Sequence, residues 1–270
     1  SDVCSSDLPA LRIKAVDLDP ARSAADLAAD LLAEMELDGG RQEVGYPAGV
    51  RTVFKTIAED VPQDAAREAA MKNLVVLATG GARGITAEVL RELARPGSTL
   101  VLTGRSRLPD AEPADTAAHR DSAALRNHFV AQVRSGALKL TPGEIGKRVQ
   151  QVLDLREMLN NVADFRAAGA AVEYHAVDVT DDDAIRTLVA DVTQRLGRID
   201  GVVHGAGVIE DKLLADKRSD SWSRVVDTKI VGLALLQKYV DPKALKFFTV
   251  FSSVAGRYGN SGQSDYATAN

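Results

Sequence analysis

The sequence predicts an α/β protein whose main part is a doubly wound parallel sheet. From Asn73 onward, short apolar runs alternate with longer segments of helical periodicity. Strands that are separated by helices in this way form parallel βαβ units. A glycine-rich turn at 79–85 follows the first apolar run and opens a helix, which is where such a sheet would bind the phosphates of a nucleotide.

The composition is that of an ordinary globular protein, with 45% hydrophobic and 26% charged residues in a chain of 270. A net charge of −5 without a basic block argues against nucleic acid as a partner. The longest apolar runs, 74–78 and 247–251, are too short to cross a membrane. With one cysteine and no visible signal peptide, we predict a cytoplasmic protein.

The block before the alternating region is predicted to be the end of a separate structural subdomain. Residues 1–8 match the translation of a common sequencing adapter, so we predict that they are an artefact. Residues 9–72 are predicted to be the C-terminal part of the subdomain plus a linker. Its predicted elements are a strand at 11–17, a helix from Asp19-Pro20 with Leu27, Leu31, Leu32 and Met35 at helical spacing, and a hairpin of 42–46 and 51–57.

Residues 73–270 are predicted to be the main domain, with a Rossmann-like sheet. The predicted strands are 74–79, 99–103, 171–177, 200–206 and 246–252, and the predicted helices are 84–95, 181–196 and 219–239. Between the second and third strands lie roughly 60 residues more than a βα connection needs. We predict a helical insertion at about 108–168, with a loop at 108–121 and helices at 122–135 and 142–168.

The glycine-rich turn is the predicted phosphate loop. Its glycines allow a tight bend and a close approach of backbone to pyrophosphate, and the helix that follows points N–H groups at the anion. Glycines needed for turn geometry alone are the alternative, but the position between strand and helix favours binding. The predicted cofactor-binding residues of this turn are Thr79, Gly80, Gly81, Arg83, Gly84 and Ile85.

Further cofactor-binding residues are predicted after the next three strands. Arg105 and Ser106 follow the second strand, where an arginine suits the 2′-phosphate of NADPH; the alternative is a solvated strand-end charge. Asp178 and Val179 follow the third strand, near an adenine, although Asp178 could equally cap the next helix. The fourth strand ends in small residues, beside which the cofactor ribose can lie against the backbone. The predicted cofactor-binding residues here are His204, Gly205, Ala206 and Gly207.

The histidines carry no metal-binding pattern. His204 is predicted to be packed and hydrogen-bonded, and the other three lack the spacing of zinc ligands. We therefore predict no metal site.

The end of the chain places a serine, a tyrosine and an asparagine in one segment after the last apolar strand. A phenol such as that of Tyr266 can deliver a proton to a carbonyl oxygen, and a hydroxyl such as that of Ser253 can hold that oxygen. Each of these residues alone has an ordinary structural explanation: a loop hydroxyl, a surface tyrosine, or a polar helix residue such as Asn270.

Together these residues resemble the short-chain dehydrogenase/reductase superfamily, and more specifically the ketoreductase domains of type I polyketide synthases and polyunsaturated fatty acid synthases. The superfamily usually places a lysine four residues after the tyrosine, whereas here that position is Asn270. Polyketide ketoreductases show the same exchange, with the lysine moved to the preceding helix, which matches Lys229. Lys229 lies 24 residues before Ser253, and Tyr266 lies 13 residues after it, as in that family.

The resemblance implies NADPH-dependent reduction of a β-ketoacyl thioester carried on the phosphopantetheine arm of an acyl carrier protein, with other synthase domains in cis. Catalytic roles are implied for Lys229, Ser253, Tyr266 and Asn270. Ile209-Glu210-Asp211 resembles the signature of ketoreductases that give the D (usually 3R) alcohol, with Asp211 controlling stereochemistry. One departure is Thr86, where the superfamily often has a third glycine.

Two rival functions remain at this point: a stand-alone reductase of a small ketone, and a catalytically silent structural subdomain. The partial structural subdomain within 9–72 argues against the former, and the four catalytic candidates argue against the latter. The chain stops at Asn270, before an expected sixth strand and substrate lid. We therefore expect the 270-residue piece alone to be poorly soluble and inactive.

Overall fold

The structure is a computed structural model that describes residues 7–8, 10–11, 13–37, 43–60, 64 and 69–270. Most of the predicted adapter-derived segment and part of the predicted linker therefore lie outside the described residues. The chain forms two compact units, each with its own sheet. Unit 1 comprises 1–64, 208–229 and 252–270, and unit 2 comprises 65–207 and 230–251.

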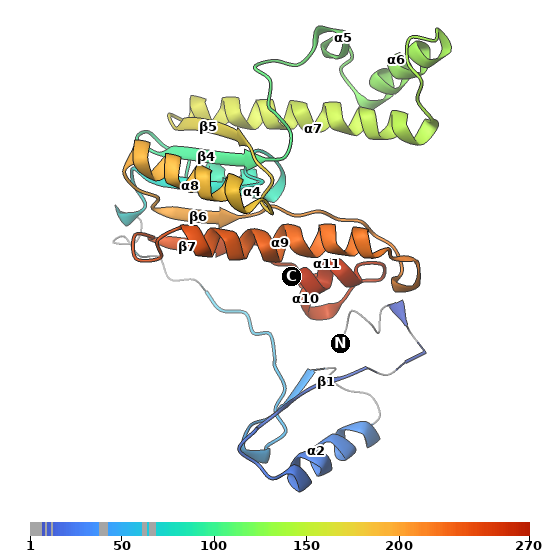
Figure 1. Cartoon of the computed structure of the whole chain (residues 1–270), viewed down its shortest axis with the longest axis vertical. Coiled ribbons are helices and arrows are strands. Elements are labelled where there is room, and N and C mark those ends of the chain that lie inside the picture. Colours follow the sequence, from blue (N-terminus) through green and yellow to red (C-terminus); the bar gives the residue numbers. More distant parts are fainter. Residues whose placement is uncertain (1–6, 9, 12, 38–42, 61–63, 65–68) are drawn as a thin grey trace. The chain divides into compact units, whose positions relative to one another are not determined.

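Unit 2 contains a five-stranded, all-parallel sheet, which confirms the predicted doubly wound architecture (Figure 1). The strand order is β5-β4-β3-β6-β7. The strands are β3 (Val75–Thr79), β4 (Thr99–Gly104), β5 (Ala171–Ala176), β6 (Gly201–His204) and β7 (Phe247–Val250).

Alternate side chains of the strands enter two separate cores, as a strand buried on both faces requires. Val76 and Ala78 of β3 pack on one face with α4 and α7, whereas Val75 and Leu77 pack on the other with α8 and α9. Because both faces are covered, β3 is an uninterrupted apolar run in the sequence. The covering helices are α4 (Gly84–Arg91), α7 (Pro142–Ala167), α8 (Asp182–Leu196) and α9 (Ser219–Tyr239).

Helices form in the segment that we predict to be a helical insertion. It consists of the short α5 (Ala114–Ala117) within the predicted loop, then α6 (Ser122–Arg134) and α7. A capping box between Thr141 and Glu144 starts α7. The first half of α7 forms a small core of its own with α6, and the second half joins the core of the sheet through Val162 and Phe165.

Unit 1 contains a parallel pair of strands, β1 (Ala15–Leu18) and β2 (Glu43–Tyr46), joined through α2 (Ala24–Glu36). The predicted hairpin of 42–46 with 51–57 is therefore wrong in its main pairing. Only Gly45 and Thr52 form an antiparallel bridge after the short η1 (Pro47–Gly49), and no strand forms at 51–57. A strand, a helix and a second strand follow one another here, which is the sequence order of a parallel βαβ unit.

The predicted apolar face of α2 is largely exposed, since Leu32 is 60% and Met35 is 76% exposed. The buried residue of this helix is instead Glu34, whose carboxylate accepts hydrogen bonds from Arg51, Lys14 and Tyr46 at 2.8 to 3.0 Å. The bonds from Arg51, followed by those from Lys14 and Tyr46, outweigh burial and lower the pKa of Glu34 to about 2.

The other elements of unit 1 are η2 (Leu214–Asp216), the first part of α9, α10 (Val254–Tyr258) and α11 (Ser264–Ala269). The last two helices pack against each other. Among the described residues, no helix combines the length and the apolar character that a membrane crossing demands.

Candidate functional site

The carboxyl ends of the parallel strands of unit 2 meet at one edge of the sheet. Thr79 at the end of β3 is in register with Thr103 of β4 on one side and with His204 of β6 on the other. The chain order of the strands reverses between β3 and β6, and ligands of doubly wound sheets bind outside the strand ends at such a point.

The glycine-rich turn after β3 forms a close-packed cradle. A Cβ at Gly80, where φ is +68°, would lie 3.1 Å from the backbone of Ala206 in the loop after β6. A Cβ at Gly81 would lie 2.8 Å from a side-chain carbon of Leu102. By contrast, the space beside Gly84, the first residue of α4, is open. The backbone N–H groups of this turn and of the start of α4 fit the phosphates of a dinucleotide, since N–H groups at a helix N-terminus bind anions.

Thr86, which replaces the frequent third glycine, is accommodated by a glycine elsewhere. Thr86 is buried, and a Cβ at Gly205 would lie 2.0 Å from its hydroxyl oxygen. The missing side chain at Gly205 therefore makes room for the extra bulk of Thr86 between α4 and the loop after β6.

His204 is fully buried, and its Nδ1 lies 2.7 Å from the hydroxyl oxygen of Thr79. The Thr79 hydroxyl also accepts the N–H of Ala206 at 3.2 Å. This matches the packed, hydrogen-bonded histidine predicted from the sequence. The pair ties the ends of β3 and β6 together and fixes the backbone of Ala206 beside Gly80.

The residues after β4 and β5 differ in exposure. Arg105 and Ser106 are exposed. Asp178 accepts the N–H and hydroxyl of Thr180 at 2.9 and 2.8 Å, and these bonds, together with the positive charge of Arg105, lower its pKa. Asp178 thus orders a turn, and the cap of α8 is Asp181 instead. Val179 is buried.

A contact that the sequence reasoning missed joins the insertion to the phosphate loop. Three side chains of α7 contact three consecutive loop residues: Asp154 pairs with the guanidinium of Arg83, Glu157 accepts the N–H of Gly84 at 2.7 Å, and Asn161 donates to the carbonyl of Ala82 at 3.0 Å. Positions 154, 157 and 161 share one face of a helix, so the polar spacing was the available signal.

The catalytic candidates belong to unit 1. Lys229 of α9 is 7% exposed, and its Nζ lies 5.9 Å from the centroid of the Tyr266 ring on α11. Burial lowers the pKa of the Lys229 amine. The structure therefore brings together the lysine and the tyrosine that the sequence separates by 37 positions.

Ser253 and Asn270 are held at the two ends of the α10–α11 pair. The Ser253 hydroxyl accepts the N–H of Ala255 and caps α10. The Asn270 amide donates to the carbonyl of Tyr266 at 2.6 Å, one turn earlier in α11. Its Oδ1 is buried and has no hydrogen-bond partner among the described residues, which leaves an acceptor for a water or an ammonium group.

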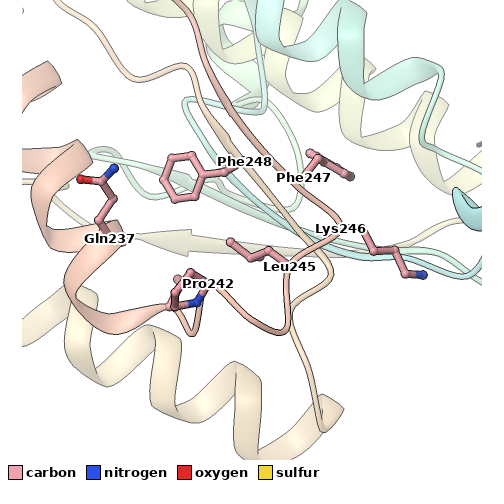
Figure 2. A pocket seen from close by; sticks show the side chains of 7 residues that line it. Gln237, Pro242, Leu245, Lys246, Phe247 and Phe248 are labelled. Carbon is pink, nitrogen blue, oxygen red and sulfur yellow. The ribbon is translucent and has the colours of Figure 1, made fainter.

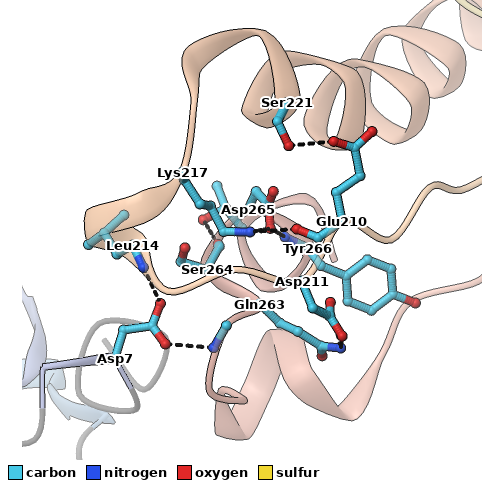
Figure 3. A network of polar contacts seen from close by, with 12 residues as sticks. Asp7, Glu210, Asp211, Leu214, Lys217, Ser221, Gln263, Ser264, Asp265 and Tyr266 are labelled. Carbon is cyan, nitrogen blue, oxygen red and sulfur yellow. Dashed lines mark hydrogen bonds and ion pairs between the residues drawn. The ribbon is translucent and has the colours of Figure 1, made fainter. Parts of the chain in front are cut away.

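A buried ion pair anchors the segment that carries Tyr266 (Figure 3). Lys217 and Asp265 lie 2.7 Å apart with side chains 2% and 1% exposed, and the Asp265 carboxylate also accepts the N–H of Tyr266. Asp211, the predicted stereochemical residue, accepts hydrogen bonds from the amide of Gln263 at 3.1 and 3.2 Å. The Tyr266 phenol points away from the ion pair. The sequence offered no signal for a pair 48 positions apart.

Unit 2 contains a pocket at the start of β7 (Figure 2). It is lined by Gln237, Val240, Pro242, Leu245, Lys246, Phe247 and Phe248. These residues precede or begin β7, whereas ligands of such sheets bind at the carboxyl ends of strands. We therefore assign the pocket no role in catalysis. No three His, Cys, Asp or Glu side chains of the described residues form a group that could hold a metal ion.

The comparisons with known proteins agree with the resemblance seen in the sequence. A family model described as "KR domain" matches residues 75–270. The chain is 37% identical over 207 residues to a polyunsaturated fatty acid synthase subunit from Thraustochytrium sp., and the match covers 74% of this chain and 7% of that protein. It is also 37% identical over 107 residues to the polyketide synthase PksN of Bacillus subtilis, across 40% of this chain and 2% of that protein.

Solved structures show the same fold. The structure of A-type ketoreductases from a modular polyketide synthase matches with a TM-score of 0.66 and 25% identity, over 100% of this chain and 47% of that one. A ketoreductase domain from the bacillaene assembly line matches with a TM-score of 0.68 and 24% identity, over 100% of this chain and 53% of that one. The chain thus spans about half of these structures and a small part of the curated relatives.

Proposed function

Because the chain belongs to the KR domain family, we propose that it carries out the NADPH-dependent reduction of a β-ketoacyl thioester to the β-hydroxyacyl thioester. The observation that carries the proposal is the buried Lys229 amine beside the Tyr266 ring, 5.9 Å from its centroid. A carbonyl reductase needs a proton donor and a positive charge next to it, and this pair supplies both.

The cofactor would be held by the phosphate loop. Gly80, Gly81 and Gly84 let the backbone come close to the pyrophosphate, and Arg83 and Arg105 offer positive charge to a 2′-phosphate. Both guanidinium groups belong to exposed residues, which a phosphate can reach. NADPH, when bound, supplies the hydride for the carbonyl carbon.

The residues of unit 1 handle the carbonyl oxygen. Tyr266 donates its phenolic proton to the oxygen as negative charge develops there, and the Lys229 charge stabilises the tyrosinate that forms. Ser253 donates a hydrogen bond to the same oxygen. The buried Oδ1 of Asn270 holds the Lys229 ammonium or a water that returns the proton to Tyr266.

The substrate would arrive on the phosphopantetheine arm of an acyl carrier protein, with further synthase domains in the same polypeptide. The curated relatives that carry this region are synthases many times longer than the chain, which supports delivery in cis. Asp211 would direct the acyl chain so that the D (3R) alcohol forms. This role is supported by the hydrogen bond that Asp211 accepts from Gln263, three residues before Tyr266.

The test is NADPH oxidation with a β-ketoacyl thioester surrogate, using the chain together with the sequence that flanks it in its gene. We expect turnover in the wild type and a loss of about 10²- to 10⁴-fold in Tyr266→Phe, the range of a general acid. NADPH affinity should be unchanged, because the phenol lies outside the phosphate loop.

Tyr258→Phe is the matched control, since it removes a phenol from α10 of the same unit. Equal turnover by Tyr266→Phe and wild type would refute the proposed proton donor. Chiral analysis of the product tests the stereochemical part, and the L alcohol would refute the role of Asp211. Failure of the wild type to bind NADPH would favour a structural domain without catalysis.

A further inference from the structure

The helical insertion contributes no residue to the proposed reaction, yet α7 touches the part of unit 2 that would hold the cofactor. We propose that Glu157 occupies the position of a cofactor phosphate at the start of α4, so that the insertion sets cofactor affinity by competing with NADPH. The inference rests on the proposed function and adds two residues, Glu157 and Asp154, that determine how tightly the cofactor binds.

The first argument is the donor that Glu157 occupies. Its carboxylate accepts the N–H of Gly84 at 2.7 Å, and Gly84 is the first residue of α4. The first N–H groups of a helix have no partner within the helix and carry partial positive charge. A carboxylate and a phosphate are both anionic acceptors for that N–H, so the arrival of one weakens the bond of the other.

The second argument is that the neighbouring positive charge is also occupied. Asp154, one turn before Glu157 in α7, forms an ion pair with Arg83, whose side chain is 51% exposed. Arg83 is one of the predicted cofactor-binding residues, and its attraction for a phosphate falls while Asp154 neutralises it. Two adjacent carboxylates of one helix thus hold two adjacent groups of the phosphate loop.

The third argument is that α7 does not depend on these two contacts for its position. Asn161 is 4% exposed, donates to the carbonyl of Ala82 and accepts from Arg91 at 2.6 Å. Phe165, one turn further along, lies in the core of the sheet. Glu157 and Asp154 can therefore release the loop while α7 stays in place, and their neutral variants should fold.

The test measures the Kd of NADPH by fluorescence, with the same protein as the test of the proposed function. Glu157→Gln should bind NADPH about threefold to tenfold more tightly than wild type, because a larger fraction of molecules has a free loop. Asp154→Asn should shift the Kd in the same direction. Asp164→Asn is the matched control: it removes a carboxylate of α7 that pairs with Arg91 of α4, at the far end from the loop, and should leave the Kd unchanged.

Amide hydrogen exchange without cofactor gives a second readout that does not depend on activity. The Gly84 amide should exchange faster in Glu157→Gln than in wild type or Asp164→Asn. Weaker NADPH binding by Glu157→Gln would overturn the inference, because it would mean that Glu157 supports the loop. An unchanged Kd would overturn it as well. Absence of NADPH binding by every variant and by the wild type would instead refute the proposed function.

Discussion

Replacing Lys217 should destabilise unit 1, because it would leave Asp265 charged in a buried position. The two side chains are 2% and 1% exposed and 2.7 Å apart. Removing one partner of such a pair costs about 3–5 kcal/mol. Lys217→Met keeps the apolar stem and removes only the ammonium, so most of the loss comes from the uncompensated carboxylate. The Asp265 Oδ2 already has no hydrogen-bond partner among the described residues.

The double variant Lys217→Met/Asp265→Asn separates charge from packing. It replaces the buried carboxylate with a neutral amide, and an incompletely satisfied neutral group costs about 1–3 kcal/mol. We therefore expect the double variant to recover about 2 kcal/mol relative to Lys217→Met.

Urea unfolding followed by fluorescence is the assay, since the one tryptophan of the chain, Trp222, lies in the same unit as the ion pair. A loss below about 1 kcal/mol in Lys217→Met would refute the reasoning, because it would mean that water reaches Asp265. Equal stability of the single and double variants would refute it too, because the two charges would then not be coupled.

Three further predictions concern the sheets and the insertion. Arg51 and the other two donors hold the pKa of Glu34 at about 2, against an ordinary 4.5. This carboxylate should therefore stabilise the fold by about 2 kcal/mol above pH 4.5, and the contribution should be lost as the pH falls from 4.5 to 2. Urea unfolding across that range should show the free energy of unfolding falling with pH in wild type and not in Glu34→Gln. Gly81→Ala should lower the free energy of unfolding by about 1–3 kcal/mol and weaken NADPH binding, because the new Cβ would lie 2.8 Å from a core side chain. An unchanged melting temperature and an unchanged Kd for NADPH would contradict this. Arg156→Lys should speed amide hydrogen exchange in the loop 112–120. Arg156 donates two hydrogen bonds to Glu112 and others to three backbone carbonyls, and a lysine cannot make all of these at once. Equal exchange rates in the variant and wild type would mean that other contacts hold this loop.

The central strands of the sheet of unit 2 were predictable because they are buried on both faces. Such a strand, for example 75–79, is an apolar run bounded by glycine or polar residues, and the connections show helical spacing. The phosphate loop was predictable for the same reason, since its glycines follow a strand and precede a helix. The boundaries were less accurate: the helix predicted at 84–95 ends at Arg91, and the strand predicted at 200–206 ends at His204.

The errors concern contacts between distant parts of the sequence. The turn residues Pro47-Ala48-Gly49 suggested a hairpin, yet β2 pairs with β1, which lies almost thirty positions earlier. Apolar spacing in α2 suggested a buried face, but the helix buries the charged Glu34, whose three partners no local pattern reveals. Glu157 and Lys217 were missed because their partners are tens of residues away.

The helix α7 belongs to two hydrophobic cores at once. Its first half packs Ile145, Val149 and Val152 with α6, and its second half packs Val162 and Phe165 under the sheet. The α6 end can therefore unfold as a separate cooperative unit while the sheet remains folded. Such a unit would tolerate substitution, insertion or proteolytic cleavage at the α6–α7 turn with little loss of global stability. The end of α7 beside the phosphate loop would evolve under the constraints of the sheet, whereas its other end could diverge between related synthases.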